Sequence, residues 1–242
     1  MGNQSQYSFT DSTSWGEKRK IRNLMQVFRN LVPASDQSCT LLEIGSGRGE
    51  FAEIVRNNGM NYIGVEPSES LRKSLQDKGF TILPDPIPSV DTPDGSIDII
   101  YSYDVLEHME NYSTILSFFN ESKRILKPDG SIVVIAPNAV TLGHIFYMHE
   151  YQHNYFTNTE RTVSLLNDAG FEVTNSRSFL TGFGLSKYKV LNVIDRMFAH
   201  TVLAFARSIF LEAIMKAILG GPMIFKIHKN LYDHFAVIAK VK

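Results

Sequence analysis

Residues 41–51 carry the residue types best suited to binding a nucleotide-like ligand, and they read Leu-Leu-Glu-Ile-Gly-Ser-Gly-Arg-Gly-Glu-Phe. Three glycines at alternate positions, Gly45, Gly47 and Gly49, follow a short apolar run and precede a helix-like segment. Glycine permits a tight turn and lets a ligand approach the backbone closely. A strand, a glycine-rich turn and a helix in this order form the ligand-binding corner of open α/β sheets. Glu43 lies just before the turn, where a carboxylate suits a cationic amino-acid group better than a pyrophosphate.

A second acid, Glu66, follows the apolar segment 62–65 and lies 21 residues beyond Gly45 (66 minus 45). An acid at about this distance, at the tip of a second strand, can accept hydrogen bonds from both hydroxyls of a ribose. A helix cap formed by Glu66 and Pro67 is the alternative. The turn differs from the dinucleotide fingerprint G-x-G-x-x-G, because Glu50 stands where that fingerprint has its third glycine. Taken alone, the turn leaves open a nicotinamide or flavin site, or an ordinary tight turn.

Histidines gather in the segment 142–157, where they alternate with tyrosines: His144, Tyr147, His149, Tyr151, His153 and Tyr155. Residues 149–153 also match the zinc-protease motif H-E-x-x-H. That motif needs both histidines on one face of a continuing helix, a third ligand and an open metal position. Thr157 and Glu160 form a capping-box pattern that starts a helix only after the histidines. We therefore expect a chance match and no metal, with a substrate-bridging metal as the lesser alternative.

Several motifs resemble those of class I S-adenosylmethionine-dependent methyltransferases. Glu43 and the three glycines match motif I of that family, E/D-x-G-x-G-x-G. Residues 104–108, Asp-Val-Leu-Glu-His, and 121–130, Glu-Ser-Lys-Arg-Ile-Leu-Lys-Pro-Asp-Gly, resemble the subgroup around ubiquinone-biosynthesis methyltransferases and glycan O-methyltransferases. The resemblance covers residues 38–178 and the last strand, and it implies that S-adenosyl-L-methionine is the cofactor.

The same resemblance implies roles for further residues. Glu66 becomes the acid that binds the ribose. Asp85 reads the adenine amino group and Ile87 lies against the adenine ring, with a solvated turn aspartate as the alternative for Asp85. We also place Pro67 and Tyr103 in the predicted cofactor site.

The resemblance also puts the loop after the fifth strand beside the transferable methyl group. An imidazole titrates near neutral pH and can take a proton from an attacking hydroxyl. We predict a catalytic base among the histidines, with His153 first, His149 next and His108, after the fourth strand, as a rival. The alternative is a loop of histidines and tyrosines that hydrogen-bonds to itself and orders the pocket wall.

These side chains need a scaffold, and the resemblance implies a doubly wound, Rossmann-like α/β fold. We expect a mostly parallel seven-stranded sheet with an antiparallel last strand. One amphipathic helix should end at Lys127, where Pro128 blocks its continuation and Asp129-Gly130 turns into the fifth strand. The expected strands include 40–44, 62–65, 97–101, 131–136, 171–178 and 235–241, and the expected helices include 50–56 and 158–169.

Two segments lie outside the predicted core of residues 38–180 and 233–242. Residues 1–37 should form a polar arm and a lid helix, from which Tyr7, Trp15 and Arg19 could close over the cofactor or substrate; alternatively Trp15 packs the helix on the sheet. Residues 181–232 should form a helical insertion with a broad apolar surface. It would cap the acceptor pocket, form a homodimer through the helices of 183–228, or contact a membrane peripherally, in that order of preference.

Composition narrows the classes of partner. The chain has 242 residues, 43% hydrophobic and 20% charged, which are globular values. A net charge of −1 supplies no basic field, so no nucleic-acid partner is expected. No segment is long and apolar enough to span a bilayer or to form a signal peptide. Cys39 is the only cysteine, so an internal disulfide is excluded and the cytoplasm is the expected location.

The sequence therefore predicts a methyltransferase for a small molecule, acting most readily on oxygen. Candidate acceptors are a sugar, a glycan precursor or a quinone-like phenol. An anionic acceptor could meet the mild basic cluster beyond the apolar helices of the insertion, made of Lys226, His228, Lys229 and His234. The alternative from another class is a regulatory or scaffold protein that binds the cofactor without catalysis.

Overall fold

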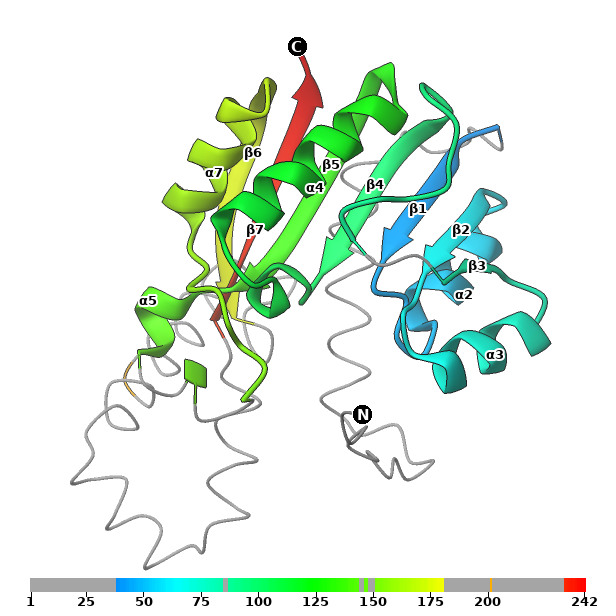
Figure 1. Cartoon of the computed structure of the whole chain (residues 1–242), viewed down its shortest axis with the longest axis horizontal. Coiled ribbons are helices and arrows are strands. Elements are labelled where there is room, and N and C mark those ends of the chain that lie inside the picture. Colours follow the sequence, from blue (N-terminus) through cyan, green and yellow to red (C-terminus); the bar gives the residue numbers. More distant parts are fainter. Residues whose placement is uncertain (1–37, 85–86, 144–145, 148–150, 181–200, 202–232) are drawn as a thin grey trace, which may run out of the picture.

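The computed structural model describes residues 38–84, 87–143, 146–147, 151–180, 201 and 233–242 (Figure 1). The strands are β1 (Thr40–Ile44), β2 (Asn61–Val65), β3 (Thr81–Leu83), β4 (Ile97–Tyr103), β5 (Leu126–Pro137), β6 (Phe171–Leu180) and β7 (Asp233–Val241). The helices are α2 (Glu50–Asn57), α3 (Glu69–Asp77), α4 (Tyr112–Ile125), α5 (Ala139–Leu142) and α7 (Thr159–Asp168), with a short 3-10 helix, η1 (Leu106–His108).

The seven strands form one sheet in the order β3-β2-β1-β4-β5-β7-β6. Strands β1 to β5 run parallel to one another, and β7 lies antiparallel between β5 and β6. The predicted mostly parallel sheet with an antiparallel last strand is confirmed. Because β1 and β4 are neighbours, the strand order reverses between them, which is the point where open α/β sheets bind ligands.

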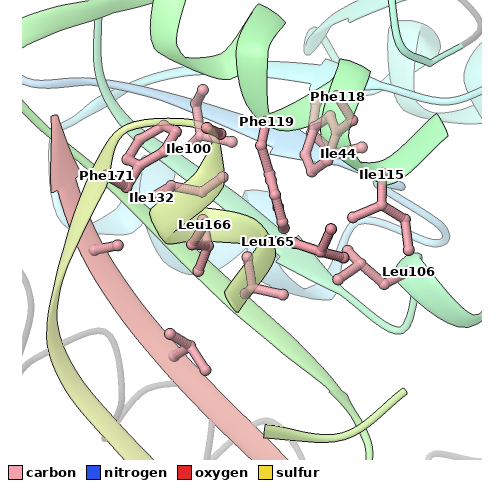
Figure 2. Packing of buried hydrophobic residues seen from close by; sticks show 14 of the residues in the cluster. Ile44, Ile100, Leu106, Ile115, Phe118, Phe119, Ile132, Leu165, Leu166 and Phe171 are labelled. Carbon is pink, nitrogen blue, oxygen red and sulfur yellow. The ribbon is translucent and has the colours of Figure 1, made fainter. Parts of the chain in front are cut away.

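Helices cover both faces of the sheet. On one face, Phe118 and Phe119 of α4 and Leu166 of α7 share a buried cluster with Ile100 and Ile132 of the central strands (Figure 2). The second face is buried by another cluster, in which α2 packs against β1 and β4. Strands buried on both faces read as nearly continuous apolar runs, which is why β1 and β4 are recognisable in the sequence.

The boundary between α4 and β5 differs from the prediction. Helix α4 ends at Ile125, not at Lys127, and β5 begins at the next residue, Leu126. Leu126 pairs with Ile97 of β4, and the Lys127 ammonium donates to the Asp98 carboxylate at 2.8 Å. The next residue of β5 paired with β4 is Ser131, opposite Ile99, so the register shifts across residues 127–130, where the turn of Pro128 to Gly130 is predicted.

Helix α7 starts after the histidines, as predicted, but its cap is a different residue. The side-chain oxygen of Asn158, not that of Thr157, accepts a hydrogen bond from the Arg161 backbone N–H at 2.8 Å. The Thr157 hydroxyl instead donates to the carbonyl oxygen of Pro137 at 2.6 Å. This bond fixes the loop before α7 to the end of β5.

Several predictions concern residues outside the described part of the chain. They are the N-terminal arm and lid helix, with Tyr7, Trp15 and Arg19, and all of the 181–232 insertion except Thr201. The roles expected for these segments stay predictions. Across the ranges that the structure does describe, helices long and apolar enough to cross a membrane are absent.

Candidate functional site

One edge of the sheet collects the polar residues singled out in the sequence. The carboxyl ends of β1, β2, β4 and β5 meet at this edge, and the antiparallel strand β7 begins there (Figure 1). The glycine turn follows β1, Glu66 follows β2, Asp104 follows β4 and Asn138 follows β5. Ligands of open α/β sheets bind outside this edge.

The glycine turn is fixed to the end of β2. The backbone N–H groups of Gly45 and Ser46 both donate to the Val65 carbonyl oxygen, at 2.9 and 3.1 Å. Gly45, Gly47 and Gly49 have φ angles of +79°, +53° and +83°. Other residues adopt this left-handed region only at a cost, so the backbone of the turn itself requires the three glycines.

The surroundings of the three glycines differ. A Cβ atom at Gly45 would lie 2.8 Å from Cγ2 of Val105, and one at Gly49 would collide with the Leu75 side chain. Among the described residues, none has an atom within 4 Å of a Cβ atom placed at Gly47. Gly45 and Gly49 thus let the turn pack closely on its neighbours, whereas Gly47 is the position whose backbone a ligand could approach.

Glu66 connects the turn to the start of α3. Its carboxylate accepts hydrogen bonds from the backbone N–H groups of Gly47, at 2.8 Å, and Ser68, at 2.9 Å. The residue is only 6% exposed. Each carboxylate oxygen has a second acceptor site, so Glu66 can hold the turn and still accept from ligand hydroxyls.

Glu43 is buried directly before the turn, with 5% exposure. The Tyr62 hydroxyl donates to its Oε2 at 2.5 Å and lies 2.9 Å from Oγ of Ser46. Burial raises the pKa of the Tyr62 hydroxyl well above its ordinary value, and the Glu43 carboxylate raises it further. The hydroxyl therefore stays protonated and fixes the orientation of Glu43.

The other residues predicted to bind the cofactor differ from one another in burial and in contacts. Pro67 is exposed, and Ile87 is half-buried against the core cluster under α4. Tyr103, the last residue of β4, stacks on the His234 ring with centroids 5.6 Å apart. Asp85 and Arg19 lie outside the described residues.

A second polar group forms where η1 meets the loop before α7. The backbone N–H groups of Asn154 and Tyr155 donate to the Glu107 carbonyl oxygen at 2.8 and 3.0 Å. Leu106, at the start of η1, is fully buried in the same cluster as Ile115 and anchors this segment to the core (Figure 2). The backbone of the histidine loop is thereby bound to the segment that follows β4.

The two described histidines of this region, His108 and His153, lie edge to face with ring centroids 5.1 Å apart. Nδ1 of His153 lies 2.7 Å from the Phe146 carbonyl oxygen, and Nδ1 of His108 lies 3.3 Å from that of Gln152. A carbonyl oxygen only accepts, so Nδ1 carries the proton in both rings and Nε2 carries the lone pair when the rings are neutral. His149, the second predicted base, lies outside the described residues.

Glu107 completes this group. It is 1% exposed, His153 is 7% exposed and His108 is half-buried. Glu107, His108 and His153 each offer one ligand atom, and the three atoms lie within 4.8 Å of one another. We call these residues the His-Glu cluster. A cluster of this composition can take up a proton or bind a cation.

A further pair at the edge was missed by the sequence analysis. Nε2 of the buried His234 lies 2.9 Å from Oδ1 of Asp104. Asp104 has a φ angle of +52°, and among the described residues it is the only one other than glycine with a positive φ. The sequence analysis places His234 in a basic cluster. Its pairing with Asp104 is missed because the two residues lie 130 positions apart in the sequence. The motif Asp-Val-Leu-Glu-His could have indicated Asp104 and Glu107 as candidate site residues, because it contains both acids.

Comparison with known proteins gives a consistent result. A family model described as a methyltransferase domain matches residues 15–176. A protein of Mycolicibacterium smegmatis, named as a probable S-adenosylmethionine-dependent methyltransferase, is 26% identical over 151 residues. The match covers 61% of this chain and 57% of that protein, so the chain spans little more than half the length of this relative.

Solved structures share the fold at low sequence identity. A SAM-dependent methyltransferase from Archaeoglobus fulgidus superposes with a TM-score of 0.58 at 21% identity, covering 91% of this chain and 94% of that one. A Haemonchus contortus phosphoethanolamine N-methyltransferase, solved with phosphomonomethylethanolamine and S-adenosylhomocysteine, gives a TM-score of 0.59 at 18% identity, covering 91% and 52%.

Proposed function

The chain belongs to the family of class I S-adenosylmethionine-dependent methyltransferases, and on that basis we propose that it methylates an oxygen atom of a small molecule. When bound, S-adenosyl-L-methionine supplies a sulfonium methyl group that a nucleophile can displace. The residues of this chain must bind that cofactor, align the acceptor with the methyl group and exclude water.

The observation that carries this proposal is the contact between the glycine turn and the segment that leads into the His-Glu cluster. Val105 lies against Gly45, and η1 begins at the next residue, Leu106. Val105 thus lies between the predicted cofactor turn, which it contacts, and the segment η1, which bears Glu107 and His108. A cofactor-binding turn beside a group that can accept a proton is the arrangement that methyl transfer to a hydroxyl needs.

The fit of the cofactor to this edge rests on Gly47 and Glu66. The space beside Gly47 is open, and the buried Glu66 carboxylate can accept from the ribose hydroxyls. Glu43, held by Tyr62, supplies negative charge near the cationic amino-acid end. We propose further cofactor contacts at the other residues that the sequence analysis predicts for this site, namely Gly45, Gly49, Pro67, Asp85, Ile87, Tyr103 and Arg19.

Oxygen is favoured as the accepting atom because of the His-Glu cluster. A phenol has a pKa of about 10, so at neutral pH it needs help in losing its proton before or during attack. Two imidazoles with Nε2 lone pairs and a carboxylate at the same edge can supply that help. A sugar, a glycan precursor and a phenol all present such a hydroxyl.

The test is acceptor-dependent release of S-adenosylhomocysteine by the full chain. S-adenosylmethionine would be incubated with sugars, phenols and phosphomonomethylethanolamine in parallel, and the product cofactor and methylated acceptor quantified by mass spectrometry. We expect turnover with at least one hydroxyl compound. Turnover with the amine alone would contradict the oxygen assignment, and binding of the cofactor without turnover on any acceptor would favour the non-catalytic alternative.

A further inference from the structure

We propose that Glu107, His108 and His153 form a binding site for one divalent cation of the zinc type. Its suggested role, to bind and activate the acceptor hydroxyl, rests on the proposed function, whereas the binding itself does not. The sequence analysis predicts no metal, because the only metal motif that it tests is the pair of His149 and His153. That motif needs both histidines on one helix. The structure brings together a different set from two separate segments, η1 and the loop before α7.

The composition and spacing of the cluster fit such an ion. Two imidazoles and one carboxylate are a ligand set of catalytic zinc sites, in which a fourth position holds water or substrate. Ligands at about 2.0–2.2 Å from zinc lie roughly 3.3–3.6 Å from one another in a tetrahedron. One candidate ligand atom of each side chain, which is either ring nitrogen for a histidine, lies within 4.8 Å of the other two, so this spacing is within about 1–2 Å of a tetrahedral site.

The protonation pattern of the two rings favours coordination through Nε2. Both Nδ1 atoms face backbone carbonyl oxygens, of Phe146 for His153 and of Gln152 for His108. Metal-binding histidines almost always donate their other ring N–H to a carboxylate, carbonyl or water, which fixes the ring orientation and the tautomer. Here both rings have this support before any cation binds.

The backbone holds the two segments at a fixed distance. The Glu107 carbonyl oxygen accepts from two successive N–H groups of the histidine loop, and the Asn154 side chain donates to the His108 carbonyl oxygen at 3.4 Å. Leu106 anchors η1 in the core. The site is therefore built on a cross-linked scaffold, and little chain entropy remains to be lost on binding.

In the reaction, the cation would bind the acceptor oxygen at its open position and lower the pKa of the hydroxyl. The hydroxyl proton leaves to solvent water. The oxygen then forms a bond to the methyl carbon, while the carbon–sulfur bond breaks and its electron pair stays on sulfur. In this scheme His108 and His153 act through the cation, as ligands.

The test measures cation binding by the full chain in the absence of any acceptor. The protein would be stripped with a chelator, and Zn²⁺ titrated by calorimetry and Co²⁺ by visible absorption. We expect one equivalent of Zn²⁺ and a visible Co²⁺ spectrum of low coordination number. His108→Asn and His153→Asn keep a donor near Nδ1 and remove Nε2, and Glu107→Gln removes the charge; each should weaken Zn²⁺ binding at least about 100-fold, the upper range for losing a supporting partner.

Glu110→Gln serves as the matched control for Glu107→Gln, since Glu110 is an exposed acid two residues beyond His108. It should bind Zn²⁺ like the parent, and retained binding of S-adenosylhomocysteine confirms that each variant is folded. No stoichiometric Zn²⁺ binding by the parent, parental affinity in all three cluster variants, or equal loss in Glu110→Gln would overturn the proposal. Comparing turnover of stripped and Zn²⁺-loaded protein then tests the activating role, so a failure of methyl transfer itself remains distinguishable from a failure of the cation site.

Discussion

Glu66 holds the glycine turn at the edge of the sheet, and we propose that it also binds the ribose of the cofactor. Its carboxylate holds the backbone N–H groups of Gly47 and Ser68, and its remaining acceptor sites are available to the ribose. Hydrogen bonds to a charged group contribute about 1.5–3 kcal/mol each and are not additive. The acid is therefore expected to contribute more to cofactor affinity than its small exposed area suggests.

Glu66→Ala should weaken S-adenosylhomocysteine binding by about 2–4 kcal/mol, or roughly 30- to 700-fold. The expected loss combines the ribose contacts with the loosened glycine turn. Calorimetric titration measures it, and Glu69→Ala, which removes an exposed acid three residues later, is the control. Unchanged affinity in Glu66→Ala would show that the second-strand acid does not contact the cofactor.

His153 was predicted from sequence as the first candidate for handling the acceptor proton. His153→Asn keeps a donor toward the Phe146 carbonyl oxygen and removes Nε2. Loss of a group that assists proton removal costs about 10²–10⁴ in rate. Turnover should fall by that factor while S-adenosylhomocysteine affinity stays near the parental value. Steady-state kinetics with Tyr112→Ala as an exposed-site control checks this, and parental turnover in His153→Asn would remove His153 from the reaction.

The sequence predicted individual residues best where one local pattern determines the geometry. Gly45, Gly47 and Gly49 were recognisable because a left-handed turn needs glycine at each position. Asp104 and His234 were missed as a pair, because strand pairing across the sheet joins them and no local pattern records it. Glu107 likewise became a candidate ligand only when η1 was placed against the histidine loop.

At the scale of elements, the glycines of the turn between β1 and α2 differ in role. Gly49 packs against the interior, whereas Gly47 is where we expect the cofactor to approach. Gly49 faces the Leu75 side chain of α3, while Gly47 has no atom of the described residues within 4 Å of a Cβ placed on it. Both have positive φ angles, so an alanine at either position strains the backbone, but only the one at Gly49 also overpacks the interior.

Gly49→Ala should therefore destabilise the fold by about 2–5 kcal/mol, the sum of left-handed strain and overpacking. Gly47→Ala should cost only about 1–2 kcal/mol in stability. It should nevertheless impair S-adenosylhomocysteine binding, because its methyl group enters the space beside the turn. Urea denaturation and calorimetry on the same pair of variants test both effects. Equal destabilisation, or intact cofactor binding in Gly47→Ala, would contradict this division.

Element boundaries were predicted less well than element identities. Apolar runs identified β1, β4 and β5, since these strands are buried on both faces. The end of α4 was misplaced by two residues, because Leu126 and Lys127 gain a pairing and an ion pair with β4 that a local Pro-Asp-Gly signal cannot reveal. The cap of α7 was misplaced by one residue for a similar reason, since the Thr157 hydroxyl donates to the Pro137 carbonyl oxygen.

At the scale of the whole molecule, the sheet order brings four candidate functional groups to one edge: the glycine turn, Glu66, the Asp104–His234 pair and the His-Glu cluster. They come from segments spread between Glu43 and His234, so the sequence could indicate each part but not their assembly. The predicted lid helix and the 181–232 insertion fall outside the described residues, and their roles as cover, dimer contact or membrane contact stay predictions.

The central claim is that this edge binds S-adenosylmethionine, and calorimetric titration of the full chain with S-adenosylhomocysteine and with NAD⁺ tests it most directly. Glu43 before the turn, the open backbone at Gly47 and the ribose acid Glu66 together predict one equivalent of S-adenosylhomocysteine and no measurable binding of NAD⁺. Tighter binding of NAD⁺ than of S-adenosylhomocysteine would contradict the account.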